Sequence, residues 1–297
     1  MIKSDIATCF IINKSAGKGK AGDEAQTIKI SASRYFDDFS IIQCTKGDDL
    51  SDIAGKASSD FENIVACGGD GTVSRIVNGI AHTTAKLGII PLGSGNDFAR
   101  AANIPENIEM NLENIRKNKC TKVDLIKITG DANTWCCNTF GMGLDGLANY
   151  NARRFRRRAG SFSYIFGTVM AVFQYYGTNM NITIDDKGIN KHLLMATICN
   201  GPDEGGLFKV APNAKINDGL LDILMVNSTF FLKKCWLFKE FLKPSGFESG
   251  VIKREKGNRV QINCEQPVYA HCDGEHLGTN IQNISAEVAP GKIDVLV

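Results

Sequence analysis

The sequence predicts an α/β N-terminal domain with a parallel sheet, followed by a mostly β C-terminal domain that forms a sandwich. In the N-terminal part, short apolar runs alternate with stretches of helical periodicity in the order βαβαβαβα, which is typical of a parallel sheet covered by helices. After Pro105 most segments alternate apolar and polar residues, as half-exposed strands do. Two glycine-rich loops each follow a predicted strand, at the sheet edge where α/β proteins bind ligands.

The stretch Asn63–Arg100 contains both of these loops. Its apolar run Ile64–Cys67 predicts a buried strand, and Gly68–Thr72 (GGDGT) predicts a tight turn into a helix with Thr72 as the N-cap. Apolar residues at positions i, i+3, i+4 and i+7 indicate the helix face that packs on the sheet: Val73, Ile76, Val77 and Ile80.

A second strand, loop and helix follow at Leu87–Ile90, Pro91–Asn96 and Asp97–Ala102. Glycines let backbone N–H groups approach a ligand closely and a helix N-terminus favours negative charge, so each loop suits a phosphate group. The loop carboxylates, Asp70 and Asp97, are compatible with a phosphate when Mg²⁺ or a lysine lies between them. The alternative is a pair of ordinary tight connections, which two such loops one strand apart make the weaker interpretation.

These residues resemble known kinase motifs. GGDGT at Gly68–Thr72 is shared by NAD kinases, phosphofructokinase-like enzymes and lipid kinases, whereas PLGSGNDFAR at Pro91–Arg100 resembles the soluble bacterial diacylglycerol kinase family. The resemblance runs from Asn13 to the Asp-Gly-Glu near the C-terminus. It implies a phosphofructokinase/NAD-kinase-like first domain that uses ATP and Mg²⁺.

The loop Asn13–Lys20 follows a predicted strand at Ala7–Ile12 and leads into a helical stretch. Its small residues and lysines suit nucleotide phosphates, although it lacks the P-loop spacing and basic loops are usually just solvated. The resemblance implies an Asn-Pro-x-x-Gly-Lys-like loop here, from which Lys14 departs, with Lys18 close to the two loop carboxylates. The nucleotide-binding residues that the resemblance implies are Asn13, Gly17, Lys18, Thr45, Gly68, Gly69, Asp70, Gly71, Thr72, Ser74, Gly93, Ser94, Asn96 and Asp97.

The first domain is completed by a strand at Phe39–Cys44 and helices at Asp49–Ser58 and Ile108–Lys117. The change of pattern places the domain boundary near Asp124, which predicts an ATP-binding α/β domain at 1–123 and a β-rich lipid-substrate domain at 124–297. The strands expected around and beyond this boundary are Thr121–Thr129, Trp135–Gly141, Met180–Asp185, His192–Asn200, Leu221–Asn227, Arg259–Cys264, Val268–Cys272 and Lys292–Val297, with a hairpin turn at Asp186–Gly188.

Asn217-Asp218-Gly219 precedes the apolar strand that begins near Leu220. From the residues alone, a hairpin turn that needs glycine is the better interpretation. The resemblance instead implies a structural Mg²⁺ bound by the Asp218 carboxylate and the main chains of Lys215 and Leu220. A hard cation with oxygen ligands and water suits such a loop.

Asp273-Gly274-Glu275 lies at the end of a predicted strand and is, by itself, also a good hairpin turn. The resemblance implies that Glu275 is the catalytic base, with Asp273 as its partner or a metal contact, and that Asp70 takes part in catalysis. Phosphoryl transfer to a hydroxyl needs a carboxylate that accepts the hydroxyl proton. The flanking histidines, His271 and His276, are expected at the surface rather than at a metal.

The composition is that of a soluble globular protein, since 43% of the 297 residues are hydrophobic and 22% are charged. A net charge of +2 gives no case for nucleic-acid binding. The ten cysteines include no CxxC pair, and no signal peptide is apparent at Met1–Phe10, so reduced thiols and a cytoplasmic location are expected. The apolar region Ser161–Tyr176 is too short and too polar to span a bilayer. The oligomeric state stays open, a homodimer being one alternative.

Two segments suggest peripheral contact with anionic membranes. Arg153–Arg158 contains five arginines in six residues and precedes the amphipathic stretch Tyr164–Tyr176. Phe230–Leu242 mixes large apolar residues with lysines, which is the composition of interfacial helices. The alternative, that the apolar residues pack on the sandwich while the charges are solvated, has equal weight.

Together these features predict an ATP-dependent lipid kinase that phosphorylates a lipid hydroxyl, with diacylglycerol, converted to phosphatidic acid, as the first choice. Sphingoid bases and phosphatidylglycerol remain alternatives. An NAD kinase-like enzyme would share GGDGT but not the second loop. A non-catalytic lipid-binding protein would have no use for Asp70, Asp97 and Glu275 beyond their places in turns.

Overall fold

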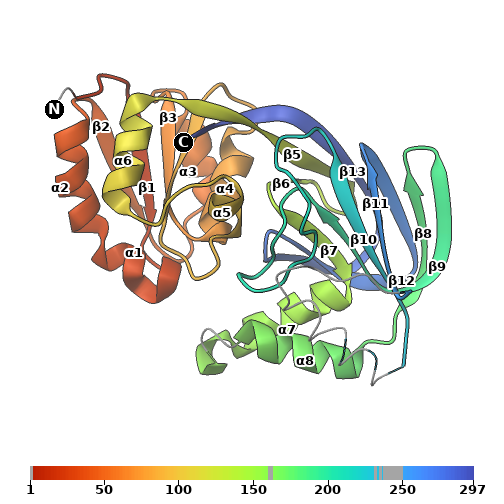
Figure 1. Cartoon of the computed structure of the whole chain (residues 1–297). Coiled ribbons are helices and arrows are strands. Elements are labelled where there is room, and N and C mark those ends of the chain that lie inside the picture. Colours follow the sequence, from red (N-terminus) through yellow and green to blue (C-terminus); the bar gives the residue numbers. More distant parts are fainter. Residues whose placement is uncertain (1–2, 160–162, 231–232, 234–235, 237–249) are drawn as a thin grey trace. The chain divides into compact units, whose positions relative to one another are not determined.

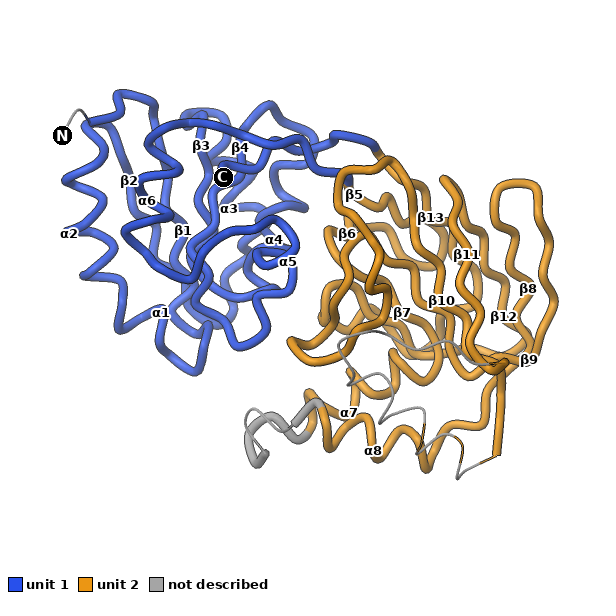
Figure 2. Tube along the Cα trace, viewed as in Figure 1, with its two compact units in different colours: residues 1–124, 290–297 blue, residues 125–289 orange. Residues whose placement is uncertain are grey.

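The structure is a computed structural model that describes residues 3–159, 163–230, 233, 236 and 250–297. The chain forms two compact units (Figure 2). Unit 1 consists of residues 1–124 and 290–297, and unit 2 of residues 125–289. The expected second domain, 124–297, is therefore wrong at its C-terminal end, because the last residues return to the sheet of unit 1.

The sheet of unit 1 contains the parallel strands β1 (Thr8–Asn13), β2 (Phe39–Cys44), β3 (Asn63–Gly68) and β4 (Lys86–Pro91). Their order is β2-β1-β3-β4. The end of β13 (Glu275–Leu296) adds to β4 in parallel, with Val295 opposite Leu87. Every residue of β3 is buried, as expected where helices cover both faces of a parallel sheet.

Helices pack on this sheet in two groups (Figure 1). Apolar residues of α2 (Ala25–Tyr35) and α6 (Ile108–Lys117) share a core with alternate residues of β1 and β3. The helices α3 (Leu50–Ala57) and α4 (Asp70–Ile80) pack against each other. The short elements of this unit are η1 (Ala16–Gly19, a 3-10 helix), α1 (Lys20–Asp23) and α5 (Asp97–Ala101).

Unit 2 is built mainly on antiparallel strands, of which β9 (Lys187–Cys199) and β12 (Arg259–Cys272) are long. Each pairs with β8 (Thr178–Ile184) along one part of its length and with β7 (Thr139–Gly143) along another. Their inward side chains form one apolar core. The other strands are β5 (Cys120–Gly130, which begins in unit 1), β6 (Thr134–Cys136), β10 (Leu221–Asn227) and β11 (Ile252–Gly257).

Several predicted elements differ from the structure. The segment Trp135–Gly141, expected as one strand, is split into β6 and β7 at Cys137 and Asn138. The two strands expected between Arg259 and Cys272 are one, β12. The hairpin between β8 and β9 turns at Asp185 and Asp186, one residue earlier than predicted.

Two helices interrupt the strands of unit 2: α7 (Leu144–Ala159) and α8 (Ser163–Gln174). The sequence pattern did not predict α7. This helix packs on β7, β9 and β12, and α8 packs on α7. No helix among the described residues has both the length and the hydrophobicity that crossing a bilayer requires.

Candidate active site

Three loops meet at the carboxyl ends of the parallel strands in unit 1. The side chain of Asn13, at the end of β1, donates a hydrogen bond of 3.0 Å to the hydroxyl of Thr72. In the same first loop Gly17 has a φ of 59°, and a Cβ there would lie 2.1 Å from the backbone oxygen of Leu92. Because no larger residue fits that gap, glycine at this position lets the first loop pack directly against the third.

The second and third loops touch through their glycines. A Cβ on Gly93 would lie 2.5 Å from the Cα of Gly69, and one on Gly69 would lie 2.9 Å from the Cα of Gly93. Asn96 links the same loops: its N–H donates to a carboxylate oxygen of Asp70 at 2.8 Å, and its side-chain oxygen accepts from the N–H of Gly93 at 3.0 Å. The two glycine-rich loops therefore form one surface of closely spaced backbone.

Helix α4 begins at Asp70 with Gly69 as its N-cap, two residues before the predicted cap at Thr72. Thr72 instead lies buried in the first turn, where its hydroxyl accepts the hydrogen bond from Asn13. Ser74 is buried one turn later. The N-terminus of this helix and the glycine loop before it offer the backbone N–H groups and positive dipole that suit a phosphate.

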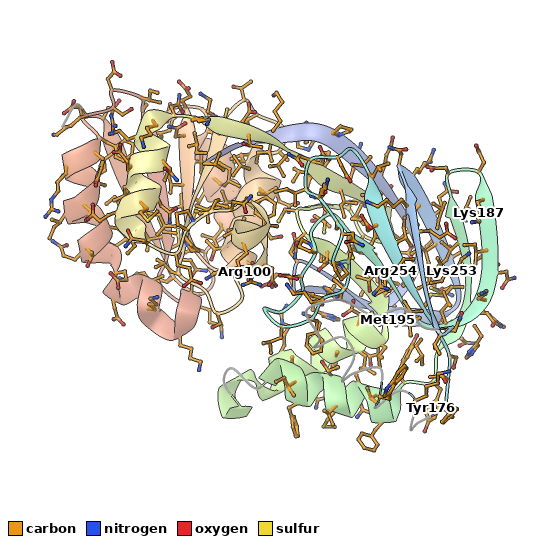
Figure 3. All side chains as sticks on the ribbon, viewed as in Figure 1. Arg100, Tyr176, Lys187, Met195, Lys253 and Arg254 are labelled. Carbon is orange, nitrogen blue, oxygen red and sulfur yellow. The ribbon has the colours of Figure 1, made fainter. Side chains whose placement is uncertain are left out.

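The remaining nucleotide-site candidates are placed as follows. Asp97 is buried and forms an ion pair with Arg100, whose guanidinium also donates to the Gly95 carbonyl; Arg100 is labelled in Figure 3. The N–H and hydroxyl of Thr45 both donate to Asp48, at 2.6 and 3.1 Å. Lys18 is exposed with a φ of 62°, Ser94 is exposed, and Gly68 and Gly71 flank the turn into α4.

The Asp-Gly-Glu turn connects β12 to β13 in unit 2. Asp273 and Gly274 take positive φ values of 49° and 76°, and Cys272 lies opposite Glu275. The side chain of Glu275 is 31% exposed, and its carboxylate lies 3.1 Å from a guanidinium nitrogen of Arg153. A carboxylate at the tip of a hairpin, held by an arginine and reachable from solvent, has the chemistry of a general base.

Asp273 is placed differently from Glu275. Its carboxylate is buried and accepts three backbone hydrogen bonds of 2.8–3.1 Å, from Cys137, Asn138 and Thr139. These N–H groups face the carboxylate instead of a neighbouring strand, which explains why the chain breaks between β6 and β7. The geometry assigns Asp273 to holding the turn, not to the expected metal contact.

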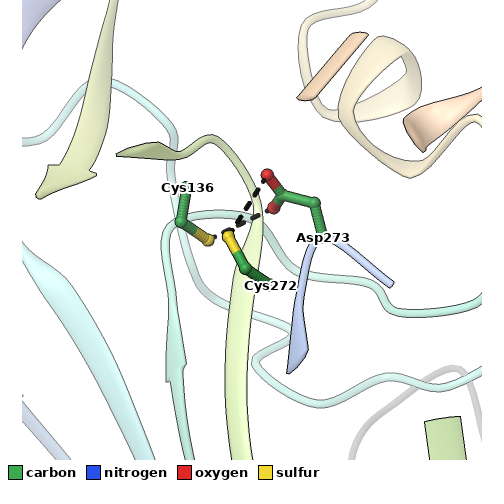
Figure 4. Close-up of side chains that lie close together, drawn as sticks. All are labelled: Cys136, Cys272 and Asp273. Carbon is green, nitrogen blue, oxygen red and sulfur yellow. Dashed lines mark hydrogen bonds between the residues drawn. The ribbon is translucent and has the colours of Figure 1, made fainter. Parts of the chain in front are cut away.

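Thiols complete the surroundings of Asp273 (Figure 4). The sulfur atoms of Cys136 and Cys137 each lie 3.2 Å from a carboxylate oxygen of Asp273. Burial, with the nearby carboxylate, raises the pKa of Cys272 to about 12 and that of Cys136 well above its usual value. These cysteines therefore remain protonated and can donate to Asp273, whose oxygens are already occupied, and the group is a poor fit for a metal ion.

His271 is fully buried, contrary to the expected surface position. Its Nε2 lies 3.2 Å from carboxylate oxygens of both Asp145 and Glu204, and the Thr197 hydroxyl donates to Asp145 at 2.8 Å. Burial lowers the pKa of His271, but the two carboxylates outweigh it and raise the value to about 9. An imidazolium between two carboxylates satisfies this cluster without a metal ion.

The Asp218 loop contains a cation of its own. One oxygen of Asp218 accepts from the N–H of Leu220 at 3.2 Å, and the other lies 3.4 Å from the ammonium of Lys256, which also pairs with Asp222 at 2.9 Å. The implied Mg²⁺, with Lys215 as a further ligand, would have to displace this ammonium. The residues therefore fit the bound ion poorly, and Lys256 supplies the positive charge.

The sequence patterns missed the functional role of α7. Asp145, Asn149 and Arg153 on this helix contact the hairpin that carries Glu275. Their spacing of four residues was a usable signal, because such residues share one face of a helix.

Two family models match the chain. The model of the diacylglycerol kinase catalytic domain matches residues 7–128, and that of the YegS C-terminal NAD kinase beta sandwich-like domain matches residues 138–297. The chain is 26% identical over 226 residues to the diacylglycerol kinase of Bacillus subtilis, which covers 75% of this chain and 74% of that protein. It is 28% identical over 248 residues to the diacylglycerol kinase of Mycobacterium tuberculosis, with 82% and 79% covered.

Solved structures show the same fold. A crystal structure of a diacylglycerol kinase from Bacillus anthracis matches with a TM-score of 0.75 at 24% identity, covering 98% of this chain and 96% of that chain. An NAD kinase from Archaeoglobus fulgidus in complex with ATP matches with a TM-score of 0.53 at 11% identity, covering 98% and 93%. At these identities the two matches concern the fold alone.

Proposed function

The chain belongs to the bacterial diacylglycerol kinase family of lipid kinases, and on this premise we propose that it transfers the γ-phosphoryl group of ATP to the primary hydroxyl of diacylglycerol. The product would be phosphatidic acid. Diacylglycerol is chosen because it presents one primary hydroxyl and because the relatives named above are diacylglycerol kinases.

The observation that carries the proposal is the joining of the three loops in unit 1. The contacts Asn13–Thr72, Asn96–Asp70 and Gly69–Gly93 bring glycine backbone, a helix N-terminus and a carboxylate to one place. Backbone N–H groups would bind the phosphates, and the Asp70 carboxylate would hold Mg²⁺, with Asp97 beside it as a second candidate. The bound ion neutralises charge on the β- and γ-phosphates.

In the reaction, the lipid hydroxyl oxygen forms a bond to the γ-phosphorus while the bond from that phosphorus to the bridging oxygen of ADP breaks. The hydroxyl proton passes to the carboxylate of Glu275. Since this transition state needs little covalent chemistry from the protein, positioning and charge neutralisation supply most of the catalysis. Asp273 contributes by holding the turn on which Glu275 lies.

A transfer assay tests the proposal. The full chain is incubated with γ-labelled ATP, Mg²⁺ and, separately, diacylglycerol, a sphingoid base, phosphatidylglycerol and NAD, and labelled products are separated. Label in phosphatidic acid supports the proposal, whereas label in another product reassigns the substrate. Absence of transfer together with no heat on titration with ATP–Mg²⁺ would leave a lipid-binding protein.

The proposal includes peripheral contact of unit 2 with an anionic membrane. Helix α8 exposes large apolar residues at helical spacing, namely Phe166 (46%), Val169 (39%) and Phe173 (58%). Tyr176, labelled in Figure 3 just beyond this helix, is 74% exposed. The side chains of Arg156–Arg158 and most of Phe230–Leu242 lie outside the described residues. Apolar side chains beside a basic segment suit an interfacial helix, with each basic residue worth about 1 kcal/mol.

A further inference from the structure

One face of α7 follows the hairpin that carries Glu275. Asp145, Asn149 and Arg153 are spaced by four residues along the helix, so their side chains lie in one row. Asp145 pairs with His271 on β12 at 3.2 Å. Further along, the amide of Asn149 donates to the carbonyl of Gly274 at 2.6 Å, and the guanidinium of Arg153 lies 3.1 Å from the carboxylate of Glu275.

The three contacts run from the protein interior to its surface. Asp145 and His271 are buried, Asn149 is buried against the turn, and the side chains of Arg153 and Glu275 are 49% and 31% exposed. The row therefore begins at a fixed point in the core and ends at the proposed base.

The helix itself is held firmly enough to serve as a support. A Cβ on Gly146 would lie 2.2 Å from the carbonyl oxygen of Tyr269, so α7 and β12 are in backbone contact there. Buried Leu147 and Ala148 pack with Ala171 of α8. Because the backbone of α7 is fixed against the strand before the turn, a side chain that projects from it can hold the turn at a defined place.

We infer that Arg153 is a positioning residue for Glu275, which it holds at the orientation required for proton transfer, with Asn149 fixing the turn beneath it. The inference rests on the proposed function, in which Glu275 is the base. An unrestrained glutamate side chain samples many rotamers, and a guanidinium fork restricts them more closely than an ammonium can. A small displacement of a reacting group has a large effect on rate.

Arg153 also begins a basic run, and many exposed ion pairs contribute nothing measurable. Arg154 separates these explanations. It carries the same charge on the same helix, but its guanidinium lies over the ring of Tyr150, 5.8 Å from the ring centre. If Arg153 acts only through charge at a membrane, or only as a surface ion pair, removing either arginine should have the same effect.

The test compares Arg153→Ala, Arg153→Lys and Arg154→Ala in the full chain, with a water-soluble short-chain diacylglycerol that removes membrane binding from the assay. We expect Arg153→Ala to lower kcat about ten-fold with an unchanged KM for ATP, Arg153→Lys to recover part of it, and Arg154→Ala to match the wild type. Equal effects of Arg153→Ala and Arg154→Ala, or a loss confined to KM, would overturn the inference.

A second measurement separates this inference from the proposed function. Amide hydrogen exchange in a peptide containing residues 273–276 should be faster in Arg153→Ala than in the wild type, and unchanged in Arg154→Ala. If the wild-type chain phosphorylates none of the acceptors, the proposed function fails, and exchange still decides whether Arg153 holds the turn. Unchanged exchange in Arg153→Ala would overturn the inference even in an active enzyme.

Discussion

The backbone N–H of Asn96 donates a hydrogen bond of 2.8 Å to a carboxylate oxygen of Asp70, which lies 26 residues earlier in the chain. The third loop of unit 1 thus fixes the orientation of the charged group in the second. A carboxylate held in this way keeps its position whether or not a ligand is present, so its effect on a bound cation can be separated from its effect on the loop.

Replacing Asp70 tests this separation. Asp70→Asn keeps an oxygen that can accept from Asn96 but removes the charge, whereas Asp70→Ala removes both. We expect both variants to lose at least about 10²-fold in the rate of transfer, because charge neutralisation supplies much of the catalysis. Circular dichroism and the melting temperature should show that Asp70→Asn folds normally. Near-normal turnover in that folded variant would place the nucleotide site elsewhere.

Glu275→Gln keeps the shape of the side chain and removes its basicity. Loss of a positioned base typically costs on the order of 10²–10⁴ in rate, so kcat should fall by that factor. ATP affinity, measured by calorimetric titration, should stay close to the wild-type value, since Glu275 belongs to unit 2 and the three loops to unit 1. A change that appeared in the KM for ATP alone would assign Glu275 to nucleotide binding.

Gly93→Ala tests the contact between the glycine-rich loops. The new methyl group would lie 2.5 Å from the Cα of Gly69, so one loop must move. We expect the free energy of unfolding to fall by about 1–3 kcal/mol, with weaker ATP binding. Gly188→Ala is the matched control, because a Cβ there meets no atom within 4 Å. Equal denaturation midpoints for the two variants would show that the close approach is unimportant.

The buried His271 predicts a pH dependence of stability. Its pKa rises from 6.5 to about 9 in the folded protein, so folding takes up a proton between these values. The stabilisation is complete below pH 6.5 and is lost as the pH rises through 9, with a slope of at most about 1.4 kcal/mol per pH unit. Denaturation at several pH values should show this slope in the wild type and in His192→Gln, an exposed histidine. A slope that persists in His271→Gln would assign it to another group.

Sedimentation with vesicles tests the proposed membrane contact. Binding should rise with the fraction of anionic lipid, fall as salt is added, and weaken when Arg156, Arg157 and Arg158 are replaced by Ser, because electrostatic attraction is screened. The control removes the same charge elsewhere in unit 2, by changing Lys187, Lys191 and Lys253 to Ser. Equal loss of binding in both triple variants, or binding that ignores salt, would exclude a specific role for the arginines.

The sequence was most informative where chemistry follows from local pattern. The loops at Gly68–Thr72 and Pro91–Asn96 each follow an apolar run, and parallel strands end at the same edge of a sheet, so their proximity could be expected. Element limits were within a few residues at β2 (Phe39–Cys44) and α6 (Ile108–Lys117). In each of these cases the determining interactions are close in sequence or follow from the topology.

What the sequence could not predict depends on distant partners. The break between β6 and β7 is caused by Asp273, which accepts hydrogen bonds from N–H groups 134–136 residues away. Helix α7 escaped detection because its buried face uses small residues, such as Gly146, Ala148 and Ala152, where a periodic pattern of large apolar residues would have been visible. His271 has no local feature that marks it as buried.

The return of residues 290–297 to unit 1 also concerns biosynthesis. The ribosome releases β1 to β4 early, but the strand that borders β4 is the last to emerge, after all of unit 2. Until then β4 presents an open edge that can pair with a foreign strand. Completion of unit 1 must therefore wait until translation ends, and a gene fragment that stops at Asp124 would encode a sheet lacking one border. A circular permutant that begins at Pro290 would supply that border first.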